Sequence, residues 1–354
     1  MSKAALRYVN AYDVVQHWLK SREPDCPFEG TSRKDFETWR RAFLPRYRRC
    51  LGAWPESVPL RLEVVEHTER SDHLREKIVY DSCEGVSVPA WMLFPKGLAR
   101  GERRPALVVC HGHGNGKDDM VGVTHEKGDP EAIKKCDELN YAYGLEAVRH
   151  GYVIIAPDWC PFGERRPPDW WYGPRRDACN VTDLAWRLFN RPLITQNIWD
   201  GMRAVDVLAR HASVNNRRIG VIGLSYGGTM ASHLLINEPR IKAGVVSGYI
   251  STLRGDALNE RGKGNICGAQ AVPSLLLYGD IPDMLGLAVP KPVLFEMGRK
   301  ETCFHFPDMD RAYRHLTRIY KAAGAADRIA RDIHPGGHRW SGRKAWAWLE
   351  RRLR

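Results

Sequence analysis

RIGVIGLSYGGTMAS, residues 218–232, joins a short apolar run to the start of a helix. The apolar half is typical of a buried strand, and Ser225 stands on the turn that follows it. Gly223 and Gly227 lie two residues to either side of this serine. A sharp strand-to-helix turn needs glycine there, because side chains would collide with the neighbouring backbone. The pattern predicts a serine nucleophile at the end of a strand, next to a helix N-terminus that favours negative charge.

Apolar runs and helical stretches alternate around this segment. From about residue 105 the order strand, helix, strand repeats, as in parallel strands joined by crossover helices, and three strand-like runs before it predict an antiparallel opening. We expect strands at 60–68, 76–80, 86–94, 106–110, 152–156, 219–224, 243–247, 293–297 and 328–333. We expect helices at 131–149, 181–211, 227–235, 310–323 and 343–353. The fold class is therefore α/β, with a mostly parallel central sheet flanked by helices.

Two segments frame the expected domain organisation. Residues 1–58 carry two amphipathic helix patterns, at 4–20 and 33–49, and we expect a helical extension packed on the body. Residues 59–354 form the expected catalytic domain, with long insertions after two strands at about 159–192 and 251–290. Connections of this length are usually functional, as lids or pocket walls. In the first insertion, Trp159, Trp170, Trp171 and Tyr172 either wall an acyl or sugar pocket or pack the insertion onto the body.

Composition narrows the classes of partner. The net charge of +12 is spread over the 354 residues in short groups, so we expect no nucleic-acid partner. No run approaches the roughly 18 apolar residues of a membrane span, and the N-terminus lacks the apolar centre of a secretory signal. The nine cysteines are scattered without a Cys-x-x-Cys pair and are expected to be reduced. We expect a cytoplasmic protein without a membrane partner, and a homo-oligomer is compatible with the sequence.

A serine needs a base to accept its proton, and a carboxylate to orient that base. In this architecture the chain order is serine, acid, histidine. After the last expected strand, His338 follows two glycines that let the loop reach the nucleophile, whereas His334 is followed by proline and suits a structural role. We favour His338.

The acid is expected after the strand at 293–297. Glu301 follows Gly298 by three residues and would lie at the carboxyl end of that strand, where it can accept the imidazole N–H. Asp308 and Asp310 remain alternatives. The tetrahedral intermediate also needs two backbone N–H donors, which we assign to Tyr226 and His113, with Gly112 as the alternative to His113.

Several motifs together show a family resemblance over residues 59–354. They are His111-Gly112-His113-Gly114, Ala156-Pro157-Asp158, Phe162-Gly163-Glu164-Arg165-Arg166, Gly223-Leu224-Ser225-Tyr226-Gly227-Gly228 and Gly336-Gly337-His338-Arg339. The chain resembles the dienelactone-hydrolase-like and acetyl xylan esterase-like branch of the α/β-hydrolases. This resemblance implies the α/β-hydrolase fold and serine-dependent hydrolysis of small-acyl carboxylic esters, without a metal or an organic cofactor.

The chain departs from this family at two points. The family commonly has aspartate as the third member of its triad, where Glu301 stands here, so the longer side chain changes the reach of the carboxylate. Dienelactone hydrolases proper use a cysteine nucleophile, and Ser225 therefore favours an esterase acting on a small-molecule ester.

Two rival interpretations come from other classes of protein. His111, His113 and His125, near Asp118 and Asp119, resemble a metal cluster, but the spacing lacks a properly placed third ligand, so a metal-dependent hydrolase is disfavoured. A catalytically silent hydrolase fold that binds a small ligand is the other alternative, because a fold alone does not guarantee activity.

Overall fold

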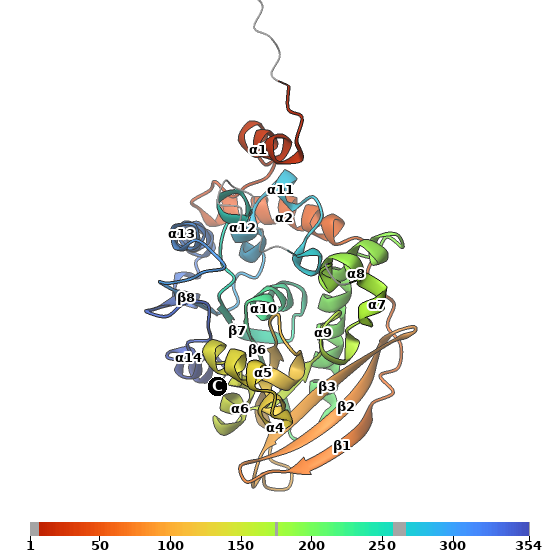
Figure 1. Cartoon of the computed structure of the whole chain (residues 1–354). Helices are drawn as coiled ribbons and strands as arrows, with labels where there is room; N and C mark the ends of the chain where they lie inside the picture. Colours follow the sequence, from red (N-terminus) through yellow and green to blue (C-terminus); the bar gives the residue numbers. More distant parts are fainter. Residues whose placement is uncertain (1–6, 174–175, 258–266, 354) are drawn as a thin grey trace, which may run out of the picture.

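The computed structural model describes residues 7–173, 176–257 and 267–353. One nine-stranded sheet runs through it in the order β1-β2-β3-β5-β4-β6-β7-β8-β9. The strands are β1 (Glu63–Glu69), β2 (His73–Cys83), β3 (Val86–Pro95), β4 (Arg104–Cys110), β5 (Val153–Pro157), β6 (Val214–Leu224), β7 (Ile241–Ser247), β8 (Val293–Gly298) and β9 (Ile329–His334). Each overlaps an expected strand, and β2 and β6 are several residues longer than expected. Figure 1 shows the antiparallel strands β1–β3 at one side of the molecule and β8 at the opposite side.

The strands from β5 to β9 in the sheet order are parallel, while β1, β2 and β3 pair antiparallel. At the carboxyl edge Cys110 pairs with Gly223, and Leu224 pairs with Ser247. Ser247 pairs in turn with Glu296. The loops that follow these strands therefore emerge next to one another. The expected mostly parallel α/β fold is confirmed.

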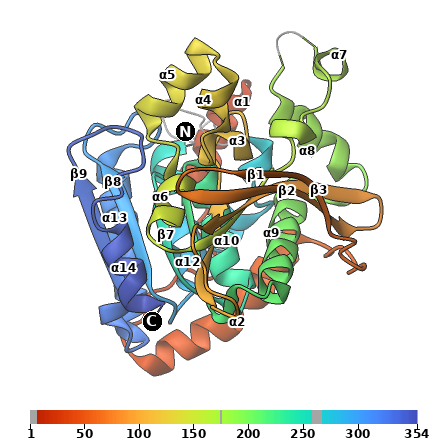
Figure 2. The same cartoon turned by 90° about the horizontal axis from the view of Figure 1, so that it is seen from below.

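Helices cover both faces of the sheet (Figure 2). They are α1 (Ala11–Ser21), α2 (Arg33–Leu51), α3 (Lys117–Met120), α4 (Val123–Lys127), α5 (Pro130–Leu139), α6 (Tyr143–Arg149), α7 (Asp169–Tyr172), α8 (Ala178–Arg187), α9 (Leu193–Arg210), α10 (Tyr226–Asn237), α11 (Leu275–Tyr278), α12 (Ile281–Gly286), α13 (Phe306–Ala322) and α14 (Ala345–Arg352). One core joins the sheet to α2, α9, α10, α12 and α13, and a second joins it to α3–α6 and α14. Along β4 the side chains alternate between the two cores, as a strand buried on both faces requires.

Two expected helices are each divided into two. The helix expected at 131–149 breaks at Asn140, whose left-handed φ of 51° ends α5. The helix expected at 181–211 breaks between α8 and α9, where Asn190 has a φ of 56° and Pro192 precedes α9. Proline fits at a helix start but not inside one, so α9 begins after Pro192.

The N-terminal segment contributes one long helix to the body. Ser32 and Asp35 form a capping box that begins α2, which satisfies the free N–H groups of its first turn. Trp39, Phe43 and Tyr47 of this helix are buried, and α2 contacts α11 and α13. In Figure 1, α1 projects at the end of the molecule beyond α2. Among the helices in the described ranges, none is long and apolar enough to cross a membrane.

Candidate active site

Ser225 occupies the turn between β6 and α10 in a strained backbone conformation. Its φ is 61° and its ψ is −121°, a region that residues other than glycine rarely adopt. A Cβ atom on Gly223 would lie 2.2 Å from the carbonyl oxygen of Gly227, and one on Gly227 would lie 1.9 Å from that of Cys110. Both positions therefore require glycine. The Ser225 N–H donates to the carbonyl oxygen of Ser247, at 3.0 Å, which fixes the turn against β7.

His338 lies on the loop after β9, and its ring reaches the same edge of the sheet. A Cβ atom on Gly248 would lie 3.0 Å from Cε1 of this ring. Gly248 follows Ser247, the residue that accepts the Ser225 N–H, so the ring lies against the strand end that holds the serine. Nε2 of His338 is buried and has no hydrogen-bond partner within the described ranges. This nitrogen is available to a hydroxyl at the site.

Glu301 is the carboxylate that the structure brings to His338. Its Oε1 lies 2.8 Å from Nδ1 of His338, and the two side chains are 1% and 10% exposed. The Cys303 N–H donates to the same carboxylate oxygen, at 2.9 Å. Burial acts to lower the pKa of His338, but the Cys303 and Glu301 side chains outweigh it and raise that pKa to about 10. The sequence analysis did not single out Cys303, although it lies only two residues beyond Glu301.

The alternative acids engage other partners. The Asp308 carboxylate contacts His305 and Arg311, at 3.0 Å and 2.7 Å, in the first turns of α13. Asp310 pairs with Arg314 and Arg331. His334, the alternative base, is the last residue of β9, and its carbonyl oxygen accepts the Arg299 N–H. The structure thus brings Glu301 to His338, while Asp308 and Asp310 pair with other residues.

The loop after β4 approaches Ser225 through Gly112. A Cβ atom on Gly112 would lie 3.2 Å from Cβ of Ser225, and 2.2 Å from the Tyr141 hydroxyl. His111 stiffens the loop, because its Nε2 accepts the Trp159 N–H at 2.9 Å. Tyr226 is the first residue of α10, where an N–H has no partner within the helix. Both segments expected to supply N–H donors therefore meet at the serine.

A buried ion-pair network anchors the far end of this loop to the first insertion. Lys117 is 1% exposed, and its Nζ lies 2.8 Å from Oδ2 of Asp158. The backbone N–H groups of Lys117 and Glu164 also donate to the Asp158 carboxylate, and Glu164 pairs with the same ammonium group. Burial acts to lower the pKa of Lys117, but Asp158 and Asp118 raise it above the ordinary value. The ammonium group therefore stays charged inside the protein.

A second buried carboxylate supports the loop that carries His338. Glu296 on β8 accepts the N–H groups of Ser341 and Gly342, each at 2.9 Å. Burial raises the pKa of Glu296 to about 7 against the lowering effect of these donors. The sequence analysis treated Glu296 only as part of a strand. The sequence signal that could have identified Glu296 was the position of a carboxylate near the carboxyl end of a buried apolar run.

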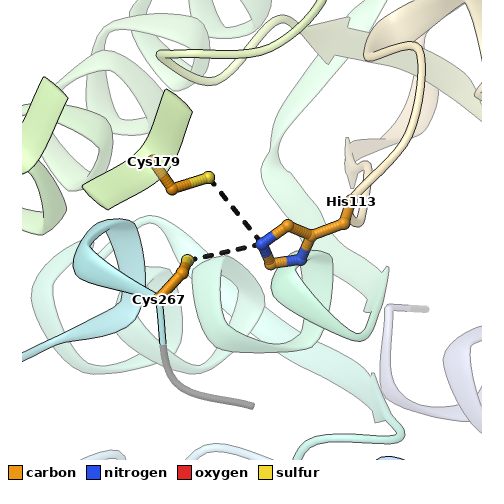
Figure 3. Close-up of side chains that lie close together, drawn as sticks. All are labelled: His113, Cys179 and Cys267. Carbon is orange, nitrogen blue, oxygen red and sulfur yellow. Dashed lines mark hydrogen bonds between the residues drawn. The ribbon is translucent and has the colours of Figure 1, made fainter. Parts of the chain in front are cut away.

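The three histidines weighed as a metal cluster are not brought together. His111 points to Trp159, and His125 pairs with Asp137 on the surface, at 2.8 Å. His113 instead faces Cys179 and Cys267, which the sequence analysis did not connect with it (Figure 3). His113 also packs edge-on against the Phe162 and Tyr226 rings. The spacing of these residues along the chain gave no indication of this cluster.

The three tryptophans of the first insertion have different surroundings. Trp159 is fully buried, close to His111 and Gly201, and so packs the insertion onto the body. Trp170 and Trp171 lie on α7 and are 82% and 40% exposed. A cavity of about 540 Å³ adjoins the loop after β4 and is lined in part by His113, Phe162, Arg166, Tyr172, Arg176 and Cys179. Phe162 and Tyr172 supply aromatic walls here, while Trp170 and Trp171 line a separate cavity of about 310 Å³.

A serine in a strained turn at the carboxyl edge of a mostly parallel sheet, with a histidine–carboxylate pair beside it, defines the class of α/β-hydrolases. Residues 1–341 match the model of the Abhydrolase family, and the chain belongs to this family. The match includes the N-terminal helices, for which the sequence analysis found no resemblance. The protein is therefore a hydrolase by family and by fold.

The chain is 26% identical over 291 residues to a Bacillus subtilis protein named "Putative hydrolase YtaP", covering 79% of this chain and 87% of that protein. A Bacteroides fragilis structure described as a "putative acetyl xylan esterase" is 18% identical, with a TM-score of 0.76 over 94% of this chain and 84% of the other. A glucuronoyl esterase from Teredinibacter turnerae is 17% identical, with a TM-score of 0.64 over 99% and 94%. At these identities the solved structures support the shared fold.

Proposed function

We propose that this protein is a serine carboxylesterase in which Ser225, His338 and Glu301 act as the catalytic triad. The observation that carries the proposal is the His338–Glu301 pair, which lies against the strand end that fixes Ser225. A buried imidazole held by a buried carboxylate is the arrangement that activates a serine hydroxyl. The backbone N–H groups of Tyr226 and His113 are the proposed oxyanion donors.

In the proposed reaction, Ser225 Oγ attacks the ester carbonyl carbon while Nε2 of His338 accepts the hydroxyl proton. The tetrahedral intermediate collapses, the C–O bond to the alcohol breaks, and His338 donates its proton to the departing alcohol. Water then attacks the acyl-enzyme, with its proton passing to His338, and releases the acid. Glu301 and Cys303 raise the pKa of His338, so they favour the imidazolium ion that forms during each attack.

A small-molecule ester with a short, acetyl-type acyl group is the proposed substrate. The family resemblance implies small acyl groups, and the fold is shared with proteins described as an acetyl xylan esterase and a glucuronoyl esterase. Gly112 supports a restricted site near the nucleophile, because even a Cβ atom there would lie 3.2 Å from Cβ of Ser225 and 2.2 Å from the Tyr141 hydroxyl. Such close walls favour a short acyl group over a long chain.

Covalent labelling with a fluorophosphonate probe tests the proposed nucleophile. We expect stoichiometric labelling of the wild-type protein and none of Ser225→Ala, because only an activated serine reacts. Turnover of p-nitrophenyl acetate should fall by about three to six orders of magnitude in Ser225→Ala. An unlabelled wild-type protein would support the silent ligand-binding alternative. A series of p-nitrophenyl esters and acetylated sugars then tests the acyl group, and a preference for long acyl chains would contradict a short-acyl site.

A further inference from the structure

Three soft or borderline metal ligands converge beside the loop after β4. His113 Nε2 lies 3.3 Å from Sγ of Cys267 and 3.8 Å from Sγ of Cys179. The three ligand atoms all lie within 4.8 Å of one another (Figure 3). They come from three separate parts of the chain: the β4 loop, the first turn of α8 and the residue before a short 3₁₀ turn, Gly268–Gln270. Both insertions therefore meet at the His113 imidazole.

The distances fit a tetrahedral metal ion. Zinc binds histidine nitrogen at about 2.1 Å and cysteine sulfur at about 2.3 Å, which separates nitrogen and sulfur by about 3.6 Å at the tetrahedral angle. The two observed nitrogen–sulfur distances, 3.3 Å and 3.8 Å, lie on either side of this value. Small rotations of the cysteine side chains would therefore complete the geometry without moving the backbone.

Neighbouring residues hold Cys267 in place beside His113. The Cys267 N–H donates to Gln270 Oε1, at 3.5 Å, and the same oxygen lies 3.8 Å from the Cys267 sulfur. Gln270 also donates to Thr229 Oγ1, at 2.9 Å, which fixes the amide to α10. Outer partners of this kind orient the ligands of a metal site. Two of the ligands, His113 and Cys179, line the 540 Å³ cavity, so a fourth position would face solvent.

We propose that His113, Cys179 and Cys267 bind one Zn²⁺ ion, with water from the cavity as the fourth ligand. Two thiolates and one imidazole are a ligand set that zinc accepts, and the thiol protons leave as the metal binds. The ion joins α8 of the first insertion and Cys267 of the second to the β4 loop. Its role is to hold the walls of the cavity together, and it takes no part in the serine reaction. The site goes beyond the proposed esterase activity and does not depend on it.

Metal content and Co²⁺ spectroscopy test this site on the full, reduced chain. We expect about one zinc per chain after loading with Zn²⁺ and removal of the excess. Co²⁺ should give the near-ultraviolet thiolate charge-transfer band and the intense visible bands of a tetrahedral site. Cys179→Ser and Cys267→Ser should each lower the Zn²⁺ affinity by at least about 100-fold. Cys26→Ser is the matched control, because Cys26 is partly buried and lies outside the cluster, and it should bind as the wild type does.

Two results would overturn the proposal. One is a Co²⁺ complex of the wild-type protein without a thiolate band, a measurement that needs no variant to fold. The other is an unreduced protein whose mass and peptide map show a Cys179–Cys267 disulfide, combined with no zinc uptake after reduction. Unfolding temperatures measured with and without Zn²⁺ extend the test. The metal should raise the wild-type value and leave that of Cys267→Ser unchanged, and an equal rise in both would also contradict the site.

Discussion

Glu301→Gln keeps the shape of the side chain that contacts His338 and removes its charge. Glu301 and Cys303 together raise the pKa of His338 from its ordinary 6.5 to about 10, against the effect of burial. A change of this size in the pKa stabilises the imidazolium ion by about 5 kcal/mol, because each tenfold change in the acid dissociation constant corresponds to about 1.36 kcal/mol. If Glu301 supplies between about half and four-fifths of it, its loss raises the barrier by roughly 2.5–4 kcal/mol. We therefore expect kcat to fall by about 10²–10³-fold.

The assay is the pH dependence of kcat/KM for p-nitrophenyl acetate. In the wild-type protein the activity should rise with pH into the alkaline range, because Nε2 of His338 accepts the serine proton only after His338 loses its own. Glu301→Gln should move this rising limb to lower pH, since the pKa of His338 falls when the neighbouring charge is lost. Cys303→Ala should move the limb in the same direction.

Asp308→Asn is the matched control, because Asp308 is another buried carboxylate on the same connection but contacts His305 and Arg311. Asp308→Asn should keep activity within about threefold of the wild type and leave the rising limb of the pH profile unchanged. The assignment of Glu301 fails if Glu301→Gln is nearly as active as the wild type, or if Asp308→Asn shows the greater loss with an intact fold.

Three further changes probe the supports of the site. Gly227→Ala would place a Cβ atom 1.9 Å from the Cys110 carbonyl oxygen. We therefore expect a marked fall in melting temperature and loss of labelling by fluorophosphonate. A melting temperature equal to that of the wild type would contradict this close approach. Lys117→Met leaves the buried Asp158 without its ammonium partner. The free energy of unfolding, measured by urea titration, should fall by about 3–5 kcal/mol. A loss under about 1 kcal/mol would show that Asp158 needs no cation. The pKa of Glu296, raised from 4.5 to about 7 by burial, means that the folded state binds a proton more tightly than the unfolded state. Wild-type stability should therefore fall as pH rises from about 4.5 to about 7, less so in Glu296→Gln, and parallel stability curves for the two proteins would refute this role.

The sheet followed from the sequence because each strand is a short apolar run bounded by turn residues. The helices were less well delimited, since the long patterns at 131–149 and 181–211 concealed breaks. The helix ends at Asn140 because this residue adopts a left-handed conformation. Asparagine can adopt this conformation, but its presence in a sequence does not show that it does. The break before α9 had a clearer signal in Pro192.

The expected base and acid were placed by chain order, and the structure brings His338 and Glu301 into contact. What the sequence did not reveal depends on contacts between distant segments. Cys267 follows His113 by more than 150 positions, and nothing in either local pattern indicates the 3.3 Å approach of their side chains. The burial of Lys117 and Asp158 was not predicted either, because it depends on packing between segments about forty residues apart.

The left-handed backbone at Ser225 also restricts which nucleophile this position accepts. With φ at 61°, a side chain branched at Cβ meets the flanking carbonyl groups, and the Gly112 backbone already lies close to Cβ of Ser225. Threonine has the same hydroxyl as serine, but its branched Cβ makes a positive φ unfavourable. Cysteine has the same unbranched shape as serine and would fit. The geometry of the turn thus accepts either serine or cysteine as the nucleophile. It disfavours threonine, although threonine keeps the hydroxyl oxygen.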